Sequence, residues 1–151
     1  MTIPTYYTIV SGTGYSKYAL VVFDNALIDA GIGDYNLVKV SSILPADCEY
    51  KKHIDIPHGS IVYAAYATAT VSEGQEISLA VAVAVPSDMR ENGVIFETSS
   101  RDNNAERIVN EMCCEAMKKR GRLIKDLKSS SIIISGKRDI YVCGVSAVVM
   151  W

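Results

Sequence analysis

The chain has 151 residues, of which 49% are hydrophobic and 21% charged, an ordinary composition for one globular domain with its own core. A formal net charge of −2 excludes a general electrostatic attraction to nucleic acid or to an anionic membrane, so neither is expected as a partner. No apolar run is long enough to span a bilayer and the first residues do not resemble a secretion signal, so we expect a cytoplasmic protein. Its four cysteines form no CxxC pair, and we expect them to be reduced and mostly buried.

The N-terminal part of the chain predicts a strand, a helix and a second strand. Residues 6–11 are β-branched and aromatic, which is typical of a strand, and the Gly-Thr-Gly segment at 12–14 is expected to turn the chain. A helix is expected over about 17–30, and because it is apolar around much of its circumference we expect it to be heavily buried. Gly31 suits a left-handed helix cap, and residues 36–41 alternate in polarity as a strand does.

The remainder predicts mostly antiparallel strands around a second helix. Strands are expected at about 60–71, 77–85, 93–98, 123–135 and 140–151. An apolar stripe at helical spacing predicts the second helix, with Ala105, Ile108, Val109, Met112, Cys113, Ala116 and Met117 along it. Asn103 followed by Glu106 resembles a capping box at its start. These patterns favour the α+β class, with two main helices.

The residues by themselves point to no specific chemistry. The sequence has no phosphate-binding P-loop, no complete GxGxxG motif and no HExxH motif. His53 and His58 lack further ligands at the spacing that a zinc site needs, so no metal is expected. Taken alone, the Ser41-Ser42 pair at a strand end is suited to capping a turn.

The order of residues around the first helix and second strand is much more specific. The pattern FD.AL..AGIG..N....(S/T)S..P is matched in register by Phe23, Asp24, Ala26, Leu27, Ala30, Gly31, Ile32, Gly33, Asn36, Ser41, Ser42 and Pro45. Residues 93–97 and the closing segment 147–151 extend the likeness over nearly the whole chain. The chain resembles the pyruvoyl-dependent arginine decarboxylase family.

The resemblance implies a fold and a self-processing reaction. The fold is a four-layer αββα sandwich, and residues 1–151 form a single decarboxylase domain. The Ser42 Oγ is expected to attack the Ser41 carbonyl carbon, and elimination from the resulting ester leaves a pyruvoyl group on residues 42–151 and frees residues 1–41. The mature enzyme is then expected to convert L-arginine to agmatine and carbon dioxide through a Schiff base with that pyruvoyl group.

The resemblance also implies residue roles. Asn36 matches an asparagine near the cleavage site, whose amide is suited to donate to the developing oxyanion. Glu97 matches the acid that protonates the carbanion after carbon dioxide leaves, and this task requires a raised pKa. Asp24 matches an aspartate that accepts the substrate's guanidinium group. Without the resemblance, Asp24 and Glu97 are more simply read as solvated surface charges.

The resemblance further implies a homotrimer, or a dimer of trimers, with active sites between subunits. It leaves open whether Asp24 serves its own pyruvoyl group or a neighbour's. Two alternatives remain from the sequence: a pyruvoyl decarboxylase for another amino acid, and a non-catalytic trimeric scaffold that never cleaves.

Overall fold

The computed structural model describes residues 3–151, which form two helices and nine strands. In chain order these are β1 (Tyr6–Ser16), α1 (Ala19–Asp29), β2 (Asn36–Lys39), β3 (Ile43–Leu44), β4 (Glu49–Tyr50), β5 (Ile61–Val71), β6 (Glu76–Pro86), β7 (Gly93–Ser100), α2 (Ala105–Lys119), β8 (Ile124–Ser135) and β9 (Tyr141–Met150). Neither helix in the described part of the chain is long and apolar enough to cross a membrane.

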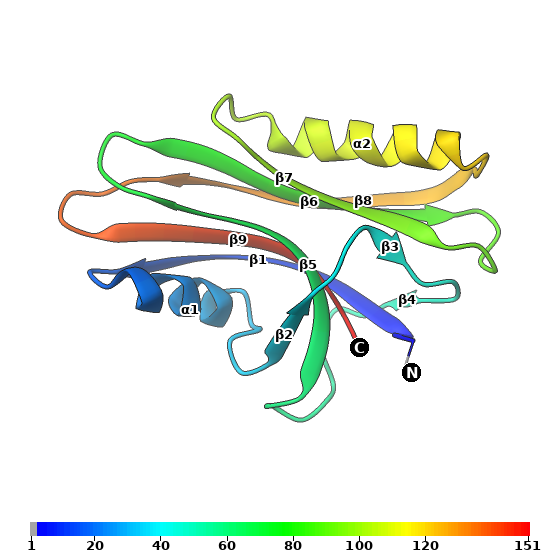
Figure 1. The fold of residues 1–151 in the computed structure, drawn as a ribbon, viewed down its shortest axis with the longest axis horizontal. Coiled ribbons are helices and arrows are strands. Elements are labelled where there is room, and N and C mark those ends of the chain that lie inside the picture. The colour runs from blue at the N-terminus through cyan, green and yellow to red at the C-terminus, as the bar shows by residue number, and fades with distance from the viewer. Residues whose placement is uncertain (1–2) are drawn as a thin grey trace.

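Two stacked sheets lie between the two helices (Figure 1). One sheet has five strands in the order β2-β5-β9-β1-β4, and the other has four in the order β3-β7-β6-β8. Helix α1 packs on β1 and β9 from one side, while α2 packs on β6, β7 and β8 from the other. The αββα sandwich and the α+β class are therefore confirmed. Most strand pairs are antiparallel, and the short edge strands β2 and β4 pair in parallel with β5 and β1.

The space between the sheets is filled by alternate residues of the facing strands, because successive side chains of a strand point to opposite faces. Val81 and Val83 of β6, Ile95 of β7 and Val148 of β9 meet there in one buried cluster. The other face of β6, with Ala80, Ala82 and Ala84, packs against α2. A strand that is buried on both faces reads as a continuous apolar run, as residues 77–85 do.

Strand β1 does not end where the sequence predicts a turn. It continues through Gly12 and Gly14 to Ser16, pairing with β9 throughout. The two glycines are needed for packing, since a Cβ on Gly12 would meet the backbone of Ala26 and Ala30, and one on Gly14 would meet that of Val22 and Ala26. Helix α1 therefore lies directly on the backbone of β1, and the predicted turn at residues 12–14 is wrong.

Substituting Gly14 with alanine should lower the free energy of unfolding by at least about 2 kcal/mol, because the added carbon meets helix backbone that cannot rotate away. Gly31→Ala is the comparison: Gly31 has a φ of +76° but nothing within 4 Å of an added Cβ, so backbone strain alone should cost about 1 kcal/mol. Urea unfolding of both variants measures the difference. Equal losses would show that α1 moves away from β1 at little cost.

Helix α1 is less buried than its composition predicts. Only Val22, Ala26 and Leu27 are buried in a single chain, while Leu20 is 91% exposed and Ile28 is 60% exposed. The predicted heavy burial is thus wrong for the isolated chain, which leaves an apolar helix face open. The end of α1 is as predicted: Gly31 is left-handed, and the N–H groups of residues 31 and 32 donate to the carbonyls of residues 28 and 27 at 2.9 Å.

The predicted capping box of α2 is also wrong. Residue 104 is the N-cap and makes no side-chain cap bond, while the Asn103 amide donates to Glu76 at 2.8 Å. Glu106 accepts hydrogen bonds from two β8 serines instead of bonding the helix start. A hydroxyl from a neighbouring strand does the capping, because the Ala105 N–H donates to Ser78 Oγ at 3.3 Å.

As expected, the cysteines are unpaired and three of the four are buried.

Candidate active site

The Ser41–Ser42 peptide bond lies where the chain crosses from one sheet to the other. On one side of it, the Val40 N–H donates to the Ala64 carbonyl of β5 at 3.0 Å. On the other side, the Ser42 carbonyl accepts a hydrogen bond from the Ile95 N–H of β7 at 2.8 Å. The bond is therefore anchored to both sheets and belongs to neither. Ser41 is exposed and Ser42 is half-buried, so the Ser42 hydroxyl is not locked inside the core.

The crossover is anchored rather than visibly strained. The non-glycine residues with positive φ in residues 3–151 are Asp47, Asn103 and Asp139. Neither serine is among them. Proximity of the hydroxyl to the preceding carbonyl therefore has to come from the fixed ends of the segment.

Glu97 lies on the strand that holds Ser42. It follows Ile95 by two residues on β7, so both side chains point to the face between the sheets, where Ile95 is fully buried. The Glu97 side chain is half-buried. Burial raises the pKa of Glu97 above its ordinary value, and the positive charge of Lys39 and a backbone hydrogen bond lower it in part. The direction is the one that the sequence predicts for this glutamate.

Asn36 is not near the serine pair of its own chain. It begins β2, and its side-chain amide donates to the Gly59 carbonyl at 2.8 Å. A strand rises about 3.3 Å per residue, so five residues separate Asn36 from Ser41 by roughly 16 Å. Within one chain the amide cannot reach the Ser41 carbonyl, and the expectation of an oxyanion donor in the same chain is not supported.

Asp24 is likewise separated from Ser42. It lies on the solvent side of α1, which covers the outer face of the five-stranded sheet, whereas Glu97 faces the space between the sheets. Around it lies the open apolar face of the helix, with Leu20, Val21 and Ile28 exposed. One chain thus brings together Ser41, Ser42 and Glu97, and leaves Asn36 and Asp24 outside this group.

The structure adds one residue that the sequence did not single out. Lys39, the last residue of β2, places its Nζ 4.6 Å from the centre of the Tyr66 ring on β5. Its positive charge also lowers the pKa of Glu97 in part. The available signal was a single basic residue two positions before the serine pair, which by itself looks like an ordinary exposed strand lysine.

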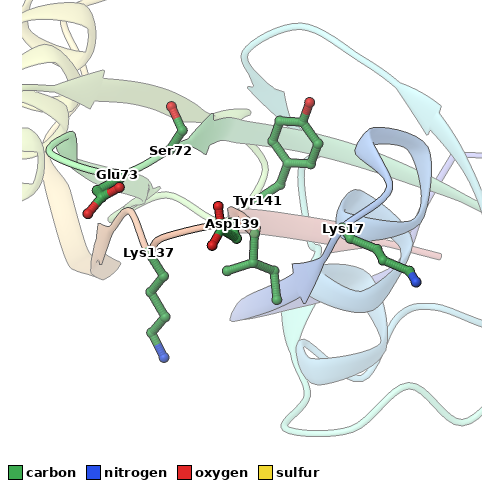
Figure 2. A pocket seen from close by; sticks show the side chains of 7 residues that line it. Lys17, Ser72, Glu73, Lys137, Asp139 and Tyr141 are labelled. Atoms are coloured by element: carbon green, nitrogen blue, oxygen red, sulfur yellow. The ribbon is translucent and has the colours of Figure 1, made fainter.

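One well-defined cavity lies away from Ser42 and Glu97. A cavity of about 400 Å³ lies at the far end of the sandwich, between the β5–β6 and β8–β9 connections and the start of α1 (Figure 2). It is lined by Lys17, Ser72, Glu73, Lys137, Asp139, Ile140 and Tyr141. Its two lysines point outward in different directions (Figure 2), so they do not converge on one ligand. Within the described residues, no three His, Cys, Asp or Glu side chains cluster as metal ligands.

Comparison with known proteins decides the family. A sequence model described as pyruvoyl-dependent arginine decarboxylase matches residues 6–151. The chain belongs to the pyruvoyl-dependent arginine decarboxylase family. It is therefore an enzyme whose prosthetic group is a pyruvoyl group. The crossover segment fits that group because the half-buried Ser42 is hydrogen-bonded to the strand that carries Glu97, an acid with a raised pKa.

Several curated relatives carry the name pyruvoyl-dependent arginine decarboxylase. The protein from Methanococcus aeolicus is 36% identical over 98% of this chain and 90% of its own length. That from Methanopyrus kandleri is 35% identical over 100% of this chain and 99% of its own. That from Pyrococcus abyssi is 39% identical over 87% of this chain and 85% of its own. The likeness covers most of the length of these relatives and is not confined to one segment.

Proposed function

We propose that this chain cleaves itself between Ser41 and Ser42 and then decarboxylates L-arginine to agmatine. The observation that carries the proposal is the anchored Ser41–Ser42 bond, with Glu97 on the strand that holds it. The choice of arginine is supported by the names of the relatives, which match over nearly their whole length.

Cleavage needs only atoms of the crossover segment and one water. The Ser42 hydroxyl adds to the Ser41 carbonyl carbon, the C–N bond breaks, and the acyl group passes from nitrogen to oxygen as an ester. Loss of the Ser42 Cα proton then breaks the Cβ–O bond and releases the Ser41 carboxylate. The dehydroalanine left at residue 42 is hydrolysed with loss of ammonia, which leaves the pyruvoyl group on residues 42–151. The two hydrogen bonds that flank the serine pair hold the reacting atoms near one another.

In the decarboxylation the chain's own residues handle the proton. The pyruvoyl carbonyl supplies the electron sink that carbon requires when carbon dioxide leaves. Glu97 holds the proton that replaces the lost carboxyl group on the substrate's α-carbon. Its raised pKa keeps more of it in the acid form near neutral pH than an exposed glutamate would have, as a general acid requires.

Within a single chain, Asn36 and Asp24 lie away from Ser42. We therefore propose that the active site is completed by a second copy of this chain in a homotrimer or a dimer of trimers. Asp24 and Asn36 then serve the Ser42 of a neighbouring subunit. The exposed apolar face of α1, which surrounds Asp24, supports this arrangement because such a face is normally covered. A carboxylate in that interface suits a substrate with a cationic side chain.

Mixing two inactive variants tests the shared site. Asp24→Asn and Glu97→Gln, each cleaved but inactive alone, should regain about a quarter of wild-type activity when unfolded together and reassembled at equal amounts, since one interface in four then pairs an intact Asp24 with an intact Glu97. Agmatine formation is the readout, and each variant reassembled alone is the control. No recovery in the mixture, with mixed oligomers present, would place both residues in the site of one chain.

The first experiment is a denaturing mass spectrum of the purified protein, followed by product analysis. We expect two chains, residues 1–41 and residues 42–151, with no free amino group at the start of the second. Agmatine and carbon dioxide should then form from L-arginine faster than the corresponding products form from lysine, ornithine or aspartate. A cleaved protein that prefers another amino acid would support the first alternative. A chain that stays intact on prolonged warm incubation and releases no amine would support the scaffold alternative.

A further inference from the structure

We propose that Asn92 is a positioning residue, whose side chain anchors the chain end that carries the pyruvoyl group after cleavage. The inference rests on the proposed function, in which residues 42–151 become a separate chain that begins at the reacting group. Asn92 lies in the connection between β6 and β7, immediately before the first residue of β7.

The new chain end is held by partners that remain with it after cleavage. A chain end normally frays unless hydrogen bonds or packing hold it. Here the Ser42 carbonyl accepts a hydrogen bond from the Ile95 N–H at 2.8 Å. The two residues of β3 then pair with Val94 and Gly93 at the start of β7 (Figure 1). All of these partners belong to residues 42–151, so release of residues 1–41 leaves the bonds in place.

The Asn92 side chain takes over where the β3–β7 ladder ends. Continuing the register by one residue places Asn92 opposite Pro45, which has no N–H group to donate. The next N–H group, that of Ala46, donates to the Asn92 Oδ1 at 2.9 Å. The Asp47 N–H then donates to the Met89 carbonyl at 2.9 Å. The bond at Asp47 joins two backbone groups, whereas the bond at Ala46 depends on a side chain and is removed by substitution.

Asn92 is itself fixed from its other side. Its backbone carbonyl accepts a hydrogen bond from the Arg122 Nη1 at 2.8 Å. The Arg122 side chain is only 22% exposed, and its Nε lies 3.7 Å from Glu91 Oε1. The Arg122 N–H donates to the carbonyl of Met117 in α2 at 3.0 Å. The oxygen offered to Ala46 therefore comes from a connection that is held to α2.

Anchoring at Ala46 bears on the reaction through Ser42. Four residues separate the two positions, and the intervening β3 pairs with β7, the strand that carries Glu97. Proton transfer from Glu97 requires a fixed distance to the reacting group, and a small displacement lowers the rate. Loss of the bond to Asn92 lets the end of β3 open more often, so the reacting group spends less time in position.

Amide hydrogen exchange tests the anchor without using activity. In Asn92→Ala the Ala46 N–H loses its partner, so it should exchange roughly threefold to tenfold faster, the fold-change that corresponds to one hydrogen bond. Asn92→Asp keeps an acceptor oxygen and should restore slow exchange. Mass spectrometry of a peptide that covers residues 43–48 gives the rates, in cleaved protein and in uncleaved Ser42→Ala protein.

Activity should change in the same order. The cleaved Asn92→Ala enzyme should lose roughly threefold to tenfold in kcat/KM for arginine, because its competent state is less populated, and Asn92→Asp should restore it. Gln75→Ala is the matched control: the Gln75 Oε1 accepts the Ser72 N–H at 2.9 Å in the β5–β6 connection, at the other end of β6. It loses the same kind of bond, yet kcat/KM and exchange at residues 43–48 should not change.

Three results would overturn the inference. One is unchanged exchange at residues 43–48 in Asn92→Ala. Another is an equal loss of kcat/KM in Gln75→Ala, which would trace the effect to general stability. The third is a loss in Asn92→Asp as large as in Asn92→Ala, which would assign the role to the amide nitrogen. If the wild type stays intact or makes no agmatine, the proposed function is wrong, while the exchange rates still decide whether Asn92 anchors this segment.

Discussion

The Ser42→Ala variant should remain one chain of 151 residues under conditions in which the wild type separates into two. Alanine removes the hydroxyl that attacks the Ser41 carbonyl, and the segment offers no replacement at that position, because the Ser41 hydroxyl precedes the carbonyl in question. Without cleavage no pyruvoyl group forms, so arginine decarboxylation should fall to background, a loss of at least about 10⁶-fold. Denaturing mass spectrometry and agmatine assay measure the two effects.

Ser41→Ala is the matched control for this variant. It keeps the Ser42 hydroxyl and the scissile carbonyl, and it keeps the hydrogen bonds on either side, since those use the backbone of Val40 and Ser42. This variant should still cleave. If instead Ser41→Ala stays intact while Ser42→Ala cleaves, the attacking hydroxyl has been assigned to the wrong serine.

The Glu97→Gln variant should cleave normally but lose about 10²- to 10⁴-fold in kcat, the range typical of removing a general acid. Glutamine keeps the shape of the side chain and cannot supply a proton, so KM should change little. In the wild type, activity should fall as the pH rises through the pKa of Glu97, which burial raises above the ordinary value. That alkaline limb should be absent from the residual activity of the variant.

Glu73→Gln provides the comparison for this loss, because Glu73 is an exposed glutamate in the β5–β6 connection, far from Ser42. Its kcat and pH profile should match those of the wild type. A Glu97→Gln enzyme with wild-type kcat would remove Glu97 from the proton transfer and leave its burial as a structural feature only.

The sequence by itself determined the features that depend on short-range order. Alternation predicted most strands, helical spacing predicted α2, and Gly31 marked the end of α1. The register of residues 23–45 was enough to identify the family and to single out Ser41 and Ser42. Patterns of this kind are local, because side-chain direction and turn geometry repeat every few residues.

The tertiary structure decided which distant residues meet. Gly12 and Gly14 look like a turn until α1 is seen lying on them, and then they are interior strand residues. The apolar composition of α1 predicts a buried helix, yet only one face of α1 packs on a sheet and the other is exposed in a single chain. Asn36 is close to Ser41 in the sequence and far from it along an extended strand, whereas Ser42 and Ile95 are far apart in the sequence and share a hydrogen bond in the fold. Such proximity depends on how the two sheets stack, which no local pattern encodes.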